Sequence, residues 1–373
     1  MLAKKYTAIL IDTSVFDRNG LKLESGLLGT LKQFKDIPTK FIVPDVIKSE
    51  LKKHLEQKVK ISKAALEKAI EDAGDQLFYK GSELNDAKRI LIDSHEIETV
   101  AEHRLNKFLE DTGAIVINTG DYVSVSQVLE KYFGNEPPFS ESGKKKNEFP
   151  DAIILMAIEA WAKENDEYVY AISHDGDWPK YSAKTDYIDH HSDLGAALAS
   201  FNKESAYLDF VSRLEIAVLD NRADEFVREV EAYLEDEVAS MFPNFDGDSA
   251  FYYEQDSCQL TFKTFSFDGG PFKIVDSGLN GIVIEAAVTI QYEAEGSFSL
   301  YQYDSIDKDN VFIDSVTEEV EGIFETNILI TLAGTPAEME EQLEVTAIEL
   351  LSKINTIHFG YLEPYYEPEE PGY

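Results

Sequence analysis

The chain has 373 residues, a hydrophobic share of 43% and a formal net charge of −37. This length allows two domains, each with a core of its own. No apolar run approaches the roughly 18 residues that would predict a membrane span. The single cysteine, Cys258, excludes an internal disulfide, so we expect a cytoplasmic protein.

The negative charge is distributed unevenly along the chain. Residues 204–373 contain 37 acidic and 7 basic residues, a net charge of −30. The chain totals are 71 acidic and 34 basic residues, which leaves 34 and 27 in residues 1–203, a net charge of −7. Strong acidity argues against a nucleic-acid partner, but here that argument applies only to the second part. We therefore predict two domains with different functions, 1–203 and 204–373.

Residues 1–203 alternate predicted strands with predicted helices. Apolar side chains run almost without interruption through each predicted strand, which is typical of parallel strands buried on both faces. Because helical patterns lie between these runs, we predict βαβ units and a mostly parallel sheet. The connection 45–112 is helical in composition and predicts a helical arm. The predicted strands are residues 6–11, 39–43, 113–118 and 167–173, with a shorter candidate at 185–189.

Residues 204–373 have a different pattern, which predicts an acidic α+β domain with an antiparallel sheet. Residues 204–241 have the composition of one or two helices rich in Glu and Asp. Side chains then alternate along residues 281–293, as in a half-buried strand, and a change of phase within residues 258–267 predicts a β-bulge. Thr335 and Glu338 fit the first and last positions of a capping box that starts a helix.

Four acids of the first part lie at positions suited to a shared site. Asp12 and Asp175 each follow a predicted parallel strand, at the edge of the sheet where ligands bind. Glu50 lies in the helix after the second strand, and Asp151 opens the helix before the fourth. Taken alone, each has a structural explanation as a turn, surface or helix-dipole residue. Together they would repel one another, and a cation bound by oxygen ligands, Mg²⁺ or Mn²⁺, would remove that repulsion.

The motifs around these acids resemble those of the PIN-domain nucleases. The segments are "LIDTSVF", "VPDVIKSEL", "FPDAIILMAIEA" and "AISHDGDW", in the family's order and on the expected elements. The resemblance covers about residues 1–203 and implies a five-stranded parallel sheet, order 3-2-1-4-5, flanked by helices. Two features depart from the family pattern: the arm is long, and Trp178 replaces the commoner Phe. The implied metal-binding acids are Asp12, Glu50, Asp151 and Asp175, with Asp177 as a supporting fifth.

The expected activity is metal-dependent hydrolysis of phosphodiester bonds, and the resemblance favours RNA over DNA. No side-chain nucleophile is needed, because the metal activates water. The substrate requires positive charge, although exposed lysines often serve only to solvate a surface. The candidate substrate-binding residues are Ser14, Lys52 and Lys53, together with Lys144, Lys145 and Lys146 in the polar loop 133–148.

Other functions remain open at this point. A catalytically silent PIN-like scaffold would bind RNA or a protein without cleaving it. A phosphatase with Asp12 as covalent nucleophile commonly has a second aspartate two positions on, where this chain has Ser14. The acidic second domain could bind a basic protein partner, restrain or trigger a toxin-like or defence nuclease, or serve solubility alone.

Overall fold

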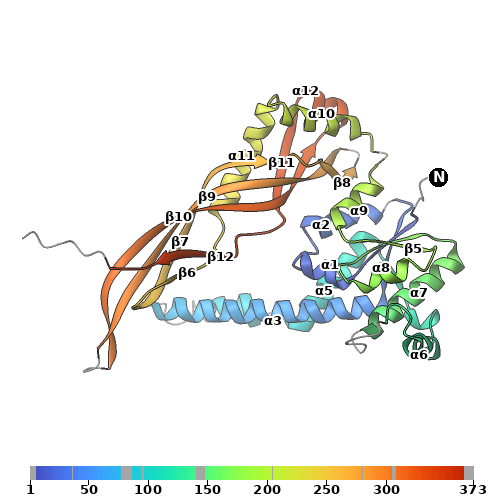
Figure 1. The fold of residues 1–373 in the computed structure, drawn as a ribbon, viewed down its shortest axis with the longest axis horizontal. Helices are drawn as coiled ribbons and strands as arrows, with labels where there is room; N and C mark the ends of the chain where they lie inside the picture. Colours follow the sequence, from blue (N-terminus) through green and yellow to red (C-terminus); the bar gives the residue numbers. More distant parts are fainter. Residues whose placement is uncertain are drawn as a thin grey trace, which may run out of the picture. The chain divides into compact units, whose positions relative to one another are not determined.

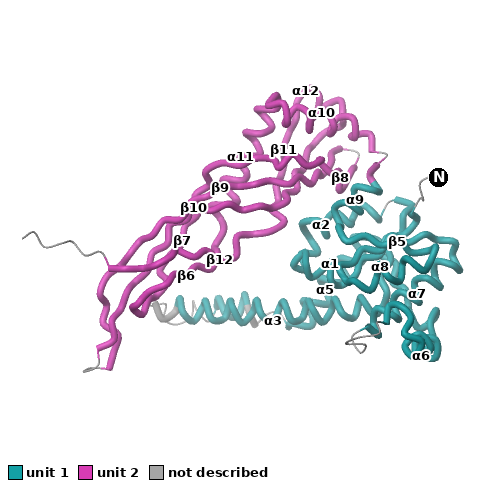
Figure 2. Tube along the Cα trace, viewed as in Figure 1, with its two compact units in different colours: residues 1–201 teal, residues 202–373 magenta. Residues whose placement is uncertain are grey.

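The computed structural model describes residues 6–35, 37–76, 86–93, 96–139, 148–203, 205–278, 280–304 and 308–364. The chain divides into two compact units, residues 1–201 and 202–373, which Figure 2 distinguishes by colour. Within the described ranges, no helix has both the length and the apolar character needed to cross a membrane.

Unit 1 is built on a five-stranded parallel sheet of order β3-β2-β1-β4-β5, which confirms the predicted order. Every residue of the central strand is buried, because neighbours pair with both of its edges and helices cover its faces. This explains the uninterrupted apolar run of its sequence. The strands are β1 (Ala8–Ile11), β2 (Lys40–Pro44), β3 (Ile115–Ile117), β4 (Val169–Ile172) and β5 (Ile188–His191).

Helices connect these strands, and the longest is α3 (Asp45–Gln76), which Figure 1 shows leaving the sheet after β2. Its first turns are anchored in the core by Ile47, Leu51 and Leu55, all fully buried. The other helical segments are α1 (Thr13–Arg18), α2 (Gly26–Gly29), η1 (Thr30–Lys35), η2 (Arg89–Asp93), α5 (Ile97–Thr112), η3 (Thr119–Asp121), α6 (Val125–Gly134), α7 (Phe149–Asn165), α8 (Asp177–Ser182) and α9 (Leu194–Phe201).

Among its described residues, unit 2 packs three helices against an antiparallel sheet of order β11-β10-β9-β7, with β8 also paired to β9. The predicted bulge occurs in β7 between Phe262 and Thr264, and the capping box of Thr335 and Glu338 starts α12. The elements are α10 (Leu208–Leu219), α11 (Asp224–Ala239), β6 (Asn244–Asp248), β7 (Tyr252–Phe267), β8 (Lys273–Gly278), β9 (Gly281–Asp304), β10 (Asp309–Ala333), α12 (Pro336–Glu341), β11 (Glu344–Leu350) and β12 (Thr356–Tyr361).

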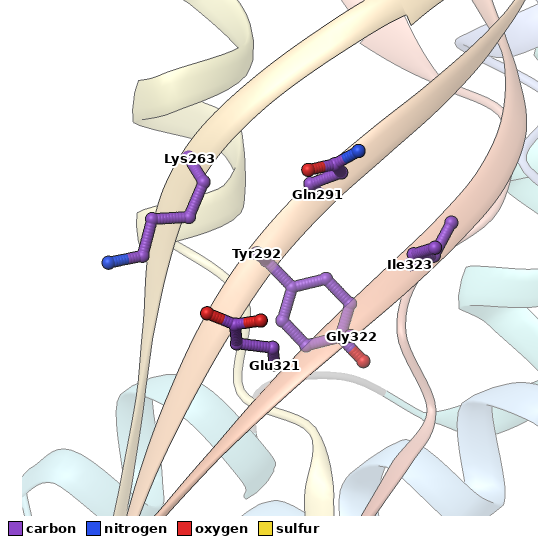
Figure 3. Close-up of a pocket in the computed structure, with 6 residues that line it drawn as sticks. All are labelled: Lys263, Gln291, Tyr292, Glu321, Gly322 and Ile323. Carbon is purple, nitrogen blue, oxygen red and sulfur yellow. The ribbon is translucent and has the colours of Figure 1, made fainter.

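A hollow of about 490 Å³ on this sheet depends on a glycine (Figure 3). Gly322 of β10 lies directly opposite Tyr292 of β9, and a Cβ atom at Gly322 would lie 2.4 Å from the tyrosine ring. Lys263 of β7 also lines the hollow and forms an ion pair with Glu293. The Tyr292 ring thus occupies the space that a side chain at position 322 would need, so a larger residue at this position would displace the ring.

Candidate functional site

Asp12 lies at the centre of the predicted site, at the carboxyl end of β1. Its backbone N–H donates to the carbonyl of Ile172 at 2.9 Å, which continues the pairing of β1 with β4. The side chain is only 6% exposed. Its Oδ2 atom accepts hydrogen bonds from the hydroxyls of Ser14 and Ser173, the latter at 2.8 Å. The carboxylate is therefore held in place by hydroxyls from the ends of two neighbouring strands.

Asp175 is positioned by the same hydroxyl that holds Asp12. Ser173, which follows β4 and is fully buried, accepts the backbone N–H of Asp175 at 2.9 Å. The Asp175 carboxylate in turn accepts the backbone N–H of Asp177 at 3.2 Å, at the start of α8. Asp175 itself is exposed. These bonds fold the chain after β4 back toward the end of β1.

Glu50 and Asp151 reach the site from helices, and each accepts a hydrogen bond from a residue near the other acids. Thr13, next to Asp12, donates its hydroxyl to Glu50 at 2.8 Å. Trp178, at the start of α8, donates its indole N–H to Asp151 at 3.0 Å. The buried face of α7 anchors this helix in the core, so its first turn presents Asp151 at the end of the sheet.

The charges of the other three acids act on Asp151. The pKa of Asp151 is raised to about 7, mainly by burial and also by the negative charges of Asp12, Asp175 and Glu50. The hydrogen bond from Trp178 acts in the opposite direction. None of the ion pairs within the described ranges involves any of these four carboxylates. Among the described residues, the fold thus gathers four acids that form no ion pair, although the charge of Lys180 acts on Asp175.

This donor set fits a divalent cation in its chemistry. The donors are carboxylate oxygens, which Mg²⁺ and Mn²⁺ prefer, and their mutual repulsion is what a cation would offset. Over the residues that the structure describes, no three His, Cys, Asp or Glu side chains already stand close enough together to enclose an ion. Among those residues, the four acids thus form an open group rather than a closed cage of ligands.

Two further predicted site residues, Ser14 and Asp177, each have a side-chain partner near the four acids. Ser14 donates to Asp12 and accepts the backbone N–H of His174 at 3.2 Å. Asp177 forms an ion pair with Lys180 at 2.6 Å, so its carboxylate already has a cationic partner.

The predicted substrate-binding lysines fall into three groups. Lys52 forms ion pairs with Glu98 and Glu102 of α5, at 3.2 and 3.3 Å. Lys53 is exposed on α3. Lys144, Lys145 and Lys146 lie outside the described residues.

Sequence reasoning missed three residues that orient the acids: Thr13, Ser173 and Trp178. Each lies next to, or within three residues of, one of the acids. A hydroxyl directly after a buried strand is the signal that could have identified Ser173. The hydrogen-bond partner of each side chain depends on how the strands and helices are placed in space, and the sequence alone does not show this.

These features define unit 1 as an α/β domain with acids gathered at the carboxyl end of a parallel sheet. Residues 9–178 match the family model of the PIN domain, in agreement with the resemblance of the sequence motifs. The PIN-domain family generally comprises nucleases. Neither the curated proteins nor the solved structures include a match to this chain.

Replacing Ser173 with alanine should weaken the site without unfolding the protein. The change removes one of the hydroxyls that hold Asp12 and the acceptor of the Asp175 N–H. Losing such an orienting partner costs about 10- to 100-fold in metal affinity or activity. We expect Ser173→Ala to need a higher Mn²⁺ concentration for half-maximal nuclease activity. Ser200→Ala is the matched control, since the Ser200 hydroxyl donates to the Ala197 carbonyl within α9; an equal Mn²⁺ requirement in both variants would contradict the assignment.

Proposed function

We propose that the PIN domain hydrolyses phosphodiester bonds of RNA with Mg²⁺ or Mn²⁺ held by Asp12, Glu50, Asp151 and Asp175. The observation that carries this proposal is the electrostatic contact of Asp151 with the other three acids, none of which forms an ion pair among the described residues. The family supports nuclease activity in general. The preference for RNA rests on the resemblance of the motifs.

The residues of the chain would provide the fixed framework of the reaction. When bound, a divalent cation supplies the Lewis acidity that activates water and offsets charge on the phosphate. Asp12 is kept in position by its two hydroxyl donors, so it needs little reorganisation to bind. The indole of Trp178 holds Asp151, and the hydroxyl of Thr13 holds Glu50. No side chain of this set needs to form a covalent bond with the substrate.

We assign nucleic-acid binding to unit 1, because the net charge of −30 in residues 204–373 repels a polyanion. The same charge suits a basic protein partner. Such a partner would make unit 2 the part through which a toxin-like or defence ribonuclease is restrained or triggered. The lone Cys258 is consistent with a reducing, cytoplasmic environment.

The test incubates the full-length protein with labelled single-stranded RNA and DNA of one sequence, in Mg²⁺, Mn²⁺ or EDTA. We expect RNA cleavage with either metal and none in EDTA. Cleavage that persists in EDTA would contradict the metal mechanism, and equal cleavage of DNA would contradict the RNA preference. RNA binding without cleavage under every condition would favour the silent scaffold.

A further inference from the structure

Unit 1 contains a cavity of about 290 Å³ between the end of α1 and the first half of α3. Asp17 and Leu21 line it on the α1 side. Four side chains line it on the α3 side: His54, Gln57, Lys58 and Ile61. Its walls therefore combine a cation, polar groups and apolar surface.

The cavity lies one helical turn from the acids. Thr13 of α1 bonds to Glu50 of α3 at 2.8 Å, and four residues further along both helices Asp17 contacts His54 at 2.9 Å. Four residues are about one turn, or roughly 5.4 Å along a helix axis. The two contacts thus connect α1 and α3 one helical turn apart. The contact of Thr13 with Glu50 belongs to the acid site, and the residues of the other contact, Asp17 and His54, line the cavity.

The chemistry of the cavity suits part of a nucleic-acid strand. Lys58 is exposed and forms no ion pair in the ranges that the structure describes, in contrast to Lys52, which is paired with two acids of α5. Ile61 is an exposed apolar residue, with 59% of its surface accessible. Proteins bind single strands by combining a cation for the phosphate with flat or apolar surfaces for the base.

We propose that this cavity binds the nucleotide next to the scissile phosphate of a single-stranded substrate. Lys58 contacts the phosphate of that nucleotide, and its base lies against His54 and Ile61, with Gln57 available to its polar edge. The volume is at the lower end for ligand sites and suits one nucleotide rather than several. The base must be unstacked to enter, which selects single strands over duplexes. The proposal deepens the function proposed above and rests on it.

The test measures the dissociation constant of a labelled single-stranded RNA for the full-length protein, by fluorescence anisotropy in Ca²⁺ over a range of salt concentrations. Each lost phosphate contact lowers the slope of log K against log salt by about one. We expect Lys58→Ala to weaken binding several-fold and to lower this slope by about one. Lys60→Ala is the control, because Lys60 is also exposed but lies two residues on, roughly on the opposite side of α3; it should match the wild type.

A second pair of variants tests the apolar wall. Ile61→Ser should weaken binding without changing the salt slope, whereas Leu66→Ser, at another exposed apolar position of α3, should have no effect. Absence of RNA binding, or equal dissociation constants and slopes for Lys58→Ala and Lys60→Ala, would overturn the proposed cavity function. Cleavage of the same RNA in Mn²⁺ is measured separately. Binding that depends on Lys58 without cleavage would support the cavity and contradict hydrolysis.

Discussion

Asp12→Asn is expected to reduce RNA cleavage by at least about 100-fold, since even residues that only orient metal ligands cost 10- to 100-fold when removed. Asparagine keeps the shape of the side chain and can still accept a hydrogen bond from Ser14 or Ser173. It removes the negative charge at the centre of the four acids. The initial rate of cleavage in Mn²⁺ is the measurement.

The matched control for this variant is Asp166→Asn. Asp166 is an exposed carboxylate in unit 1 that ends α7 with φ 55°, a conformation that asparagine adopts readily. The control makes the same chemical change away from the site, so its cleavage rate should equal that of the wild type. Full activity of Asp12→Asn would show that the hydrolysis, if present, does not use these acids.

Asp151→Asn is expected to stabilise the protein against unfolding at pH 8 in EDTA, although it removes a proposed metal ligand. Burial and the neighbouring acids raise the pKa of Asp151 from 3.8 to about 7 in the folded protein. Ionised Asp151 therefore costs folding free energy. This cost is absent well below the unfolded-state pKa of 3.8, grows as the pH rises toward 7, and is complete above 7. Asparagine cannot ionise, so the variant does not have this cost in folding free energy.

The expected gain at pH 8 is on the order of 1 kcal/mol or more, a rise of a few degrees in Tm. It should vanish toward pH 3, below the ordinary pKa of 3.8, where the wild type is protonated in both states. Thermal melting from pH 3 to pH 9 provides the measurement. Added Mg²⁺ should raise the Tm of the wild type more than that of Asp151→Asn, because a bound ligand stabilises the folded state. A variant less stable than the wild type at pH 8, with an unchanged pH profile, would contradict this account of Asp151.

The architecture of unit 1 could be predicted because its strands are buried on both faces and leave uninterrupted apolar runs. The strand order came from the resemblance rather than from periodicity. In unit 2, the alternation of buried and exposed side chains in β9 and the capping box that begins with Thr335 could also be predicted from neighbouring residues. These signals all lie within a few consecutive residues.

Features that depend on distant partners could not be predicted. β6 has the sequence "NFDGD", which is polar and mostly outside the core, yet it pairs in parallel with β12 more than 100 residues later. The contact of His358 with Asp246 at 2.8 Å forms part of that pairing. The bond from Trp178 to Asp151 likewise requires α7 and α8 to be placed side by side. The amino-acid sequence of one chain does not show which distant segments lie side by side.

The two halves of α3 are under different structural constraints. The segment up to Leu55 carries the buried side chains that fix Glu50, whereas residues 56–73 include no buried side chain. Insertions or deletions of whole helical turns beyond Ile61 would therefore leave the acids undisturbed. Related proteins could therefore differ in the length or composition of this outer part of α3 and keep the same four acids. Their substrate preference could then change while the hydrolytic activity is retained.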